Sequence, residues 1–172
     1  PIIGDSLSRF LDPIKKKINI LDLKVNWKRI SKIDFIACGT SYFACQTATY
    51  WFEKYLNLNA NSYLASEFRY KTYVKSKNTL SIFISQSGET ADTLAALRFA
   101  KKNDSKIFSI VNNSESSIAR ESHNFITIEA GPEIGVASTK AFTAQLSVLA
   151  CLCLIAGSCL LYTSPSPRDL RK

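Results

Sequence analysis

The sequence predicts an α/β fold, a three-layer sandwich built around a five-stranded parallel sheet. Two observations lead to this prediction. Short apolar runs alternate with segments of helical period from residue 33 onward, and turns rich in hydroxyl groups follow two of these runs. Strands joined through helices lie parallel in one sheet, and such sheets bind ligands beyond the carboxyl ends of their strands. We therefore expect a binding site where the two turns meet.

The strand candidates are short runs that contain β-branched or aromatic residues. They are residues 33–37, 63–65, 80–84, 106–111 and 125–128. Helix candidates follow them at residues 42–56, 66–72, 91–102, 117–122 and 139–156. The clearest helix is 91–102, in which Ala91, Leu94, Ala95 and Phe99 share one face. Lys101 and Lys102 suit its carboxyl end, where the helix dipole is negative.

Composition narrows the class of protein. The 172 residues are 46% hydrophobic and 21% charged, which is typical of one globular domain with a core of its own. The formal net charge is +8, yet no zinc-finger, basic-zipper or RNA-stacking motif accompanies it. We expect no nucleic-acid partner, and a basic surface that steers small anions.

The five cysteines are odd in number and form no Cys-x-x-Cys pair, which favours free thiols in a reducing compartment. No signal peptide is visible, and the longest apolar stretch, residues 146–156, is short of the roughly 20 residues a membrane span needs. We expect a cytoplasmic protein that does not enter a membrane. The start at Pro1 without a methionine suggests a chain that begins earlier.

The stretch around which the chain is organised is Ser85-Gln86-Ser87-Gly88-Glu89-Thr90, between a strand and a helix. The first backbone N–H groups of a helix lack internal partners, and the helix dipole is positive there. Gly88 lets the backbone approach a ligand closely, and three hydroxyl groups add neutral donors. This is a suitable cradle for a phosphate group.

An ordinary turn is the alternative, because serine and threonine also cap helices and Thr90 could simply cap its own. A second turn of the same kind, Cys38-Gly39-Thr40-Ser41, shifts the balance toward a shared phosphate site. Neither the P-loop nor the dinucleotide glycine motif occurs, so a phosphomonoester such as a sugar phosphate is the expected ligand. The single histidine, His123, has no cysteine or histidine at ligand spacing, so we expect neither a metal nor a cofactor.

Four blocks of the sequence resemble the sugar isomerase (SIS) family. They are residues 37–42, 65–70, 85–93 and 133–140. Together, and in their order along the chain, they resemble the first SIS subdomain of the glutamine–fructose-6-phosphate aminotransferase family. This resemblance implies a flavodoxin-like SIS fold. Members of that family transfer ammonia from glutamine to fructose 6-phosphate and isomerise the product to glucosamine 6-phosphate.

The resemblance implies a set of contacts to a hexose 6-phosphate, either fructose 6-phosphate or glucosamine 6-phosphate. By position these are Gly39, Thr40, Ser41, Ser85, Gln86, Ser87 and Thr90, with Cys38, Val136 and Ser138 lining the sugar. The glutaminase domain and the second SIS subdomain, which supplies the general base and the ring-opening histidine, are absent from this sequence. The resemblance therefore implies a fragment that binds substrate without catalytic residues of its own, taken from a protein that is a homodimer at full length.

We expect three segments: a connector at 1–32, the SIS domain at 33–157, and a disordered tail at 158–172 whose native origin stays open. Two other functions remain as alternatives. One is a sugar-phosphate-sensing module of a transcription regulator, and the other is a complete small isomerase. Glu89 and Glu133 receive no assigned chemistry, although Glu133 lies in a loop that could close the site.

Overall fold

The computed structural model describes residues 10–12, 17–18, 23–72, 78–103, 105–131 and 139–161. Its centre is a sheet of five parallel strands in the order β4-β3-β5-β6-β7. The strands are β3 (Lys32–Ala37), β4 (Asn59–Leu64), β5 (Thr79–Ser85), β6 (Lys106–Val111) and β7 (Asn124–Thr127). All seven residues of β5 are buried, as expected for the middle of a sheet that is covered on both faces. The predicted five-stranded parallel sheet is confirmed.

The strand order contains one reversal, and it lies between β3 and β5. The chain passes from β3 to β4 on one side and then crosses back to place β5 on the other side of β3. The ends of the two inner strands are aligned to within one residue, with Ala37, the last residue of β3, opposite Ile84. The turns after β3 and β5 therefore leave the sheet side by side, at the position where flavodoxin-like sheets bind their ligands.

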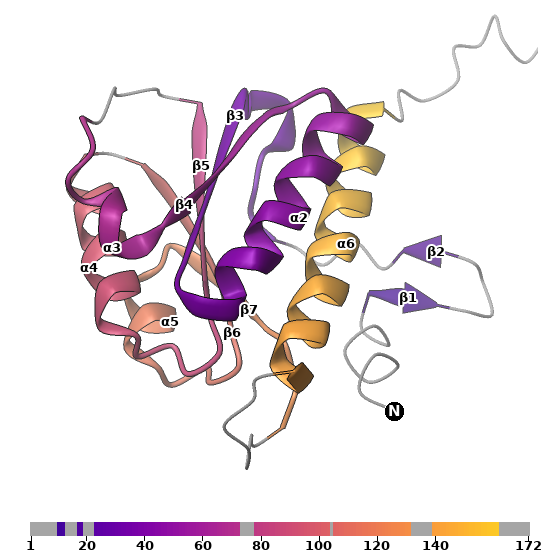
Figure 1. The fold of residues 1–172 in the computed structure, drawn as a ribbon. Helices are drawn as coiled ribbons and strands as arrows, with labels where there is room; N and C mark the ends of the chain where they lie inside the picture. Colours follow the sequence, from indigo (N-terminus) through magenta and orange to yellow (C-terminus); the bar gives the residue numbers. More distant parts are fainter. Residues whose placement is uncertain are drawn as a thin grey trace, which may run out of the picture.

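Helices cover both faces of the sheet, which completes the predicted three-layer sandwich (Figure 1). They are α2 (Gly39–Leu56), α3 (Ala65–Phe68), α4 (Ala91–Lys102), α5 (Ser117–Glu121) and α6 (Thr139–Leu161). In Figure 1, α2 and α6 lie side by side on one face, and α3, α4 and α5 lie on the other. Each face has its own apolar cluster, one packed under α2 and α6 and the other under α3, α4 and α5.

Residues before β3 contribute to the first of these clusters. The short 3-10 helix η1 (Trp27–Arg29) buries Trp27, whose ring centroid lies 6.3 Å from that of Phe52 in α2. Leu23 and Ile30 are also buried in this cluster. Further upstream, β1 (Leu11–Asp12) pairs antiparallel with β2 (Lys17–Ile18). The segment at 23–30, expected to be part of a connector, is thus packed as part of the domain core.

Helix α6 is longer than the sequence analysis expected, because it continues past residue 156 to Leu161 and so includes residues 158–161, which were expected to begin a disordered tail. Its 23 residues, with a mean hydropathy of 2.2 over an 18-residue window, could cross a membrane by length and composition alone. Half of that window is buried inside the protein, however, and the helix packs against α2. Burial accounts for the apolar residues on the buried side of α6, whereas Leu154 and Leu161 are 52% and 65% exposed.

The other differences from the sequence prediction are small and occur at element ends. Helix α2 begins at Gly39 rather than at residue 42, so its first turn includes the hydroxyl-rich turn itself. Strand β4 covers six residues instead of three, and polar residues along it explain why its pattern was weak. Helix α4 and strand β6 have the predicted bounds, since an apolar run and a clear helical face define them.

Candidate functional site

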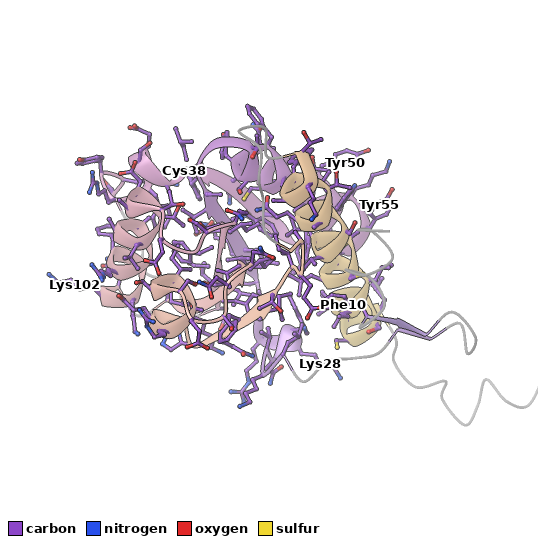
Figure 2. All side chains as sticks on the ribbon, turned by 90° about the horizontal axis from the view of Figure 1, so that it is seen from below. Phe10, Lys28, Cys38, Tyr50, Tyr55 and Lys102 are labelled. Atoms are coloured by element: carbon purple, nitrogen blue, oxygen red, sulfur yellow. The ribbon has the colours of Figure 1, made fainter. Side chains whose placement is uncertain are left out.

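The two predicted turns are brought together at the carboxyl edge of the sheet. Residues 38–41 lead from β3 into α2, and residues 85–90 lead from β5 into α4. Cys38 is labelled in Figure 2, which views the molecule from below in Figure 1. Thr40 and Ser87 are exposed, Cys38, Gln86 and Thr90 are partly exposed, and Ser41 and Ser85 are buried. The exposed members are open to solvent, whereas only small parts of Ser41 and Ser85, which are 7% and 3% exposed, reach the surface.

The turn after β5 is held by hydrogen bonds from its own hydroxyl groups. The backbone N–H of Gly88 donates to Ser85 Oγ at 3.0 Å, and Ser85 Oγ lies 2.9 Å from Thr90 Oγ1. Ser87 Oγ accepts the backbone N–H of Glu89 at 3.2 Å. Because Ser87 Oγ accepts this bond, its own proton is free to be donated to a ligand.

Thr90 occupies the N-cap position of α4, yet its side chain forms no cap hydrogen bond. The alternative in which Thr90 simply caps its helix therefore does not describe this structure. When Ser85 donates to Thr90, the Thr90 proton remains available, and Thr90 is the more exposed of the two. A chain of donors then runs from the Gly88 amide through both hydroxyls toward solvent, and each bond in it polarises the next.

Gly88 is required by both its conformation and its surroundings. Its φ of +70° lies in the left-handed region, and a Cβ placed on it would overlap the Oγ and Cβ of Ser116. Its carbonyl oxygen also accepts the backbone N–H of Ile118 at 3.1 Å. The turn after β5 is thus pressed against the start of α5.

Glu89, the acidic residue beside the proposed phosphate site, is turned away from it. Its Oε1 accepts the backbone N–H of Ser117 at 2.7 Å, in the first turn of α5. Hydrogen bonds from Ser117 lower the pKa of Glu89, and the nearby Arg120 adds a smaller effect of the same sign. The carboxylate therefore stabilises the start of a neighbouring helix; it stays ionised, and its hydrogen bond directs it to α5.

The turn after β3 gives α2 a first turn without a side-chain cap. Cys38 is the N-cap residue and forms no cap hydrogen bond. Gly39 has a φ of +57° and no atom lies within 4 Å of the place where its Cβ would be, so the backbone is open to a ligand there. Ser41, the third residue of α2, accepts a hydrogen bond from Gln145 of α6 at 2.9 Å. Both helices that start at the strand-order reversal thus present first-turn amides without a side-chain cap.

Asn112, which the sequence analysis did not identify, connects three turns at this edge. Its backbone N–H donates to the carbonyl of Gln86 at 3.1 Å. Its side chain accepts the backbone N–H of Ala130 at 2.9 Å and donates to the carbonyl of Gly131 at 3.0 Å. An asparagine directly after a buried strand was the only available signal. Asn112 therefore holds the turn after β5 to the segment that follows β7.

Part of the predicted site lies outside the described residues. Val136 and Ser138, expected to line the sugar, and Glu133, expected to lie in a closing loop, fall between residues 131 and 139. The assignment of all ten predicted contacts stays a prediction. The structure brings eight of them to the same edge of the sheet, which are Cys38, Gly39, Thr40, Ser41, Ser85, Gln86, Ser87 and Thr90.

A cavity of about 240 Å³ lies at the amino edge of the sheet, away from the two turns. Its lining includes the first residues of β6 and β7 and the exposed His123. His123 Nδ1 accepts the backbone N–H of Ile107 at 2.9 Å, so this nitrogen carries no proton. Burial, and to a lesser extent the charge of Lys101, lower the pKa of His123 below its ordinary 6.5. The histidine has a structural role at this edge.

Lowering the pH is expected to destabilise the protein through His123. Its pKa is lower in the folded than in the unfolded chain, so its contribution is complete above pH 6.5 and is lost as the pH falls through the folded value. The loss should stay below about 1 kcal/mol, since solvent screens this exposed side chain. Urea unfolding between pH 7.5 and 5 measures it. His123→Asn keeps an acceptor and cannot be protonated, so its stability should change less over this range; an equal change would contradict the assignment.

The five cysteines are free thiols. Burial raises the pKa of Cys45, Cys151 and Cys153, the last to about 11, so these three are unreactive at neutral pH. Cys38 is partly exposed beside the first turn of α2. Within the described residues no three cysteine, histidine or carboxylate side chains gather as metal ligands.

Comparison with known proteins gives relatives that agree in name. The chain is 47% identical to a glutamine–fructose-6-phosphate aminotransferase (isomerizing) from Brucella abortus over 155 residues, which are 90% of this chain and 26% of that protein. A protein of the same name from Mesorhizobium japonicum is 49% identical over 91% of this chain. The chain thus spans about a quarter of the length of these relatives.

Solved structures agree with these relatives. The C-terminal domain of glucosamine-fructose-6-phosphate aminotransferase from Francisella tularensis superposes with a TM-score of 0.87 at 40% identity, over 95% of this chain and 46% of that one. A glucosamine-6-phosphate deaminase from Thermotoga maritima shares the fold, with a TM-score of 0.69 at 23% identity over 95% of this chain and 49% of that one. The SIS domain family matches residues 28–155. The chain therefore belongs to the SIS domain family.

Proposed function

We propose that this chain is the phosphosugar-binding half of the isomerase domain of a glutamine–fructose-6-phosphate aminotransferase. Its ligand is a hexose 6-phosphate, either fructose 6-phosphate or glucosamine 6-phosphate. The observation that carries the proposal is the pairing of two hydroxyl-rich turns at the strand-order reversal, each opening a helix that lacks a side-chain cap. The similarity to aminotransferases over 90% of the chain supports the same ligand class.

The two turns suit a dianionic phosphate because they offer many donors, while Asp92, the acidic residue in the first turn of α4, lies 3.8 Å from the Arg69 guanidinium. First-turn amides of α2 and α4 point toward the edge of the sheet, where the positive ends of both helix dipoles lie. The exposed hydroxyls of Thr40 and Ser87 and the partly exposed Thr90 add donors between them. Glu89, the acidic residue within the turn, is engaged by Ser117. The phosphate would lie in this cradle, and the sugar would extend past Cys38 toward residues 136 and 138.

The proposed role is binding and orientation rather than turnover. In the proposed full-length protein, ammonia released from glutamine would reach fructose 6-phosphate held here, and the general base would come from another part of the protein. No catalytic residue is assigned within this chain, and no cofactor enters the proposal. Isolated, the chain should bind hexose 6-phosphate and leave it chemically unchanged.

The proposed setting is the cytoplasm, with a homodimer at full length and no nucleic-acid or membrane partner. Five free thiols support a reducing compartment. The net charge of +8 suits the attraction of small anions. The apolar helix α6 packs on α2, which covers one side of it within the domain. The proposed SIS domain spans residues 33–157, and the burial of Leu23, Trp27 and Ile30 supports including residues 23–32 with it.

Isothermal titration calorimetry with fructose 6-phosphate tests the proposal. Ser87→Ala should weaken binding by about 1.5–3 kcal/mol, or roughly 10- to 150-fold, because one hydrogen bond to a charged group is lost. Ser31→Ala is a matched control, since this exposed serine precedes β3 at the opposite edge of the sheet. Absence of binding by the unaltered chain, or an equal affinity of Ser87→Ala, would refute the proposal.

A further inference from the structure

Gln145 is a buried amide in the middle of an apolar helix. It is only 1% exposed, and its neighbours one turn away on α6, Ala141, Leu149 and Val148, are buried and apolar. Its Nε2 donates to Ser41 Oγ, and its Oε1 has no partner among the described residues. Leaving a polar atom unpaired in a core is unfavourable. The packing of α6 on α2 would be served equally well by an apolar side chain, so the amide calls for another explanation.

The hydrogen bond from Gln145 decides what Ser41 can do. A hydroxyl group that accepts one hydrogen bond keeps its own proton for another acceptor. Within the described part of the chain no acceptor takes the Ser41 proton, and Ser41 lies in the first turn of α2 beside the exposed Thr40. The same polarity occurs in the other turn, where the Gly88 amide donates to Ser85. In both turns a buried hydroxyl group accepts an N–H group and so keeps its own proton for another acceptor.

We propose that Gln145 is a positioning residue for the phosphate group of the ligand. It fixes the Ser41 hydroxyl as a donor to the anion and ties α6 to the start of α2. This inference rests on the proposed function, because it assumes that an anion occupies the edge where the two turns meet. Gln145 does not touch the ligand; it acts through Ser41, 104 positions away in the sequence.

A double-mutant cycle tests the coupling between the two residues. Fructose 6-phosphate is titrated calorimetrically into the unaltered chain, Ser41→Ala, Gln145→Met and the double variant. Methionine matches the shape of glutamine without its amide, and the loss of the unpaired Oε1 offsets the loss of the bond to Ser41, so thermal unfolding should show Gln145→Met to be folded and close in stability to the unaltered chain. Each single variant should bind about 10-fold more weakly, and the double variant no more weakly than Ser41→Ala alone. The inference would be overturned if the losses of binding free energy in the two single variants added up in the double variant, or if Gln145→Met bound fructose 6-phosphate as tightly as the unaltered chain.

Gln145→Glu supplies a readout that a purely structural role would not give. When protonated, the carboxyl group can still donate to Ser41, and burial raises its pKa into an accessible range. When ionised, the carboxylate can only accept a hydrogen bond. The Ser41 hydroxyl then donates to this carboxylate instead of to the ligand, and the negative charge repels the anion. Affinity should be near that of the unaltered chain at pH 5.5 and at least about 10-fold weaker at pH 8. Titration with sulfate, which does not itself change charge over this range, separates the effect from ionisation of the ligand.

The outcomes separate the two proposals. If the unaltered chain binds no fructose 6-phosphate, the proposed function fails and the role of Gln145 fails with it. If the unaltered chain binds and Gln145→Glu shows the same pH dependence as the unaltered chain, the role of Gln145 alone is refuted. If affinity follows the ionisation of the introduced glutamate and the cycle is not additive, Gln145 positions Ser41 as proposed.

Discussion

Gly88→Ala should lower the free energy of unfolding by about 2–5 kcal/mol and abolish most ligand binding. The left-handed φ of +70° costs an alanine about 1–2 kcal/mol, and the new methyl group would overlap Ser116. Overpacking of this kind adds about 1–3 kcal/mol. Because the methyl would meet the Cβ as well as the Oγ of Ser116, a rotation of the serine side chain cannot relieve the contact. Urea unfolding and calorimetry with fructose 6-phosphate measure the two effects.

Binding should fall by about 100-fold or more in Gly88→Ala, because Ser87 and Thr90 move together when the turn is displaced and two donors to the anion are lost. Gly39→Ala is the matched control for stability. Its φ is also positive, at +57°, but no atom lies within 4 Å of the added Cβ, so only the backbone cost of about 1–2 kcal/mol should be seen. Adding Ser116→Gly to Gly88→Ala should restore the part of the free energy of unfolding that is lost through overlap with the Ser116 side chain. Equal destabilisation by the two alanine variants would contradict the steric explanation.

Trp27→Ala should lower the free energy of unfolding by about 3–5 kcal/mol, the usual range for deleting a large buried aromatic side chain. Trp27 is 3% exposed and contacts Phe52, whose ring packs edge-on against Phe35 of β3 at 5.4 Å. For a chain of this size the melting temperature should fall by roughly 6–20 °C, which differential scanning calorimetry measures. Such a loss is a large part of the roughly 5–15 kcal/mol that stabilises a typical domain.

The controls for Trp27→Ala distinguish a core residue from a connector residue. Lys28→Ala changes the exposed neighbour of Trp27 and should alter stability by no more than about 0.5 kcal/mol. Trp27→Phe keeps an aromatic ring and should give an intermediate loss. If Trp27→Ala were as mild as Lys28→Ala, residues 23–30 would belong to a connector, as the sequence alone suggested, and their burial would contribute little to stability.

Local patterns account for the parts of the fold that could be predicted. The period of α4 and its terminal Lys101 and Lys102 define that helix, and an apolar run of β-branched residues defines β6. The position of the two turns also follows from local pattern, because each lies between a strand and a helix. Given a parallel sheet, both must then lie at the same edge.

Contacts between residues far apart in the sequence could not be predicted in this way. Glu89 is hydrogen-bonded to Ser117, 28 positions away, and Gln145 is hydrogen-bonded to Ser41, 104 positions away. Neither pair gives a periodic pattern in the sequence. A glutamine in an apolar helix has the same local pattern whether it faces solvent or a partner. The burial of Trp27 was missed for a similar reason, since it depends on Phe52 of α2 and not on its own neighbours. Sequence patterns locate the donors of the site, whereas tertiary contacts determine which protons are free.

The hydrogen bonds of the turn after β5 join its own residues, so none of them requires a ligand. Capture of an anion would therefore order little new backbone, and most of the binding free energy would be retained as affinity. Such a rigid receptor also discriminates poorly among ligands that share the same anionic end. Selection between one phosphorylated metabolite and another must then be made by groups that surround the remainder of the molecule.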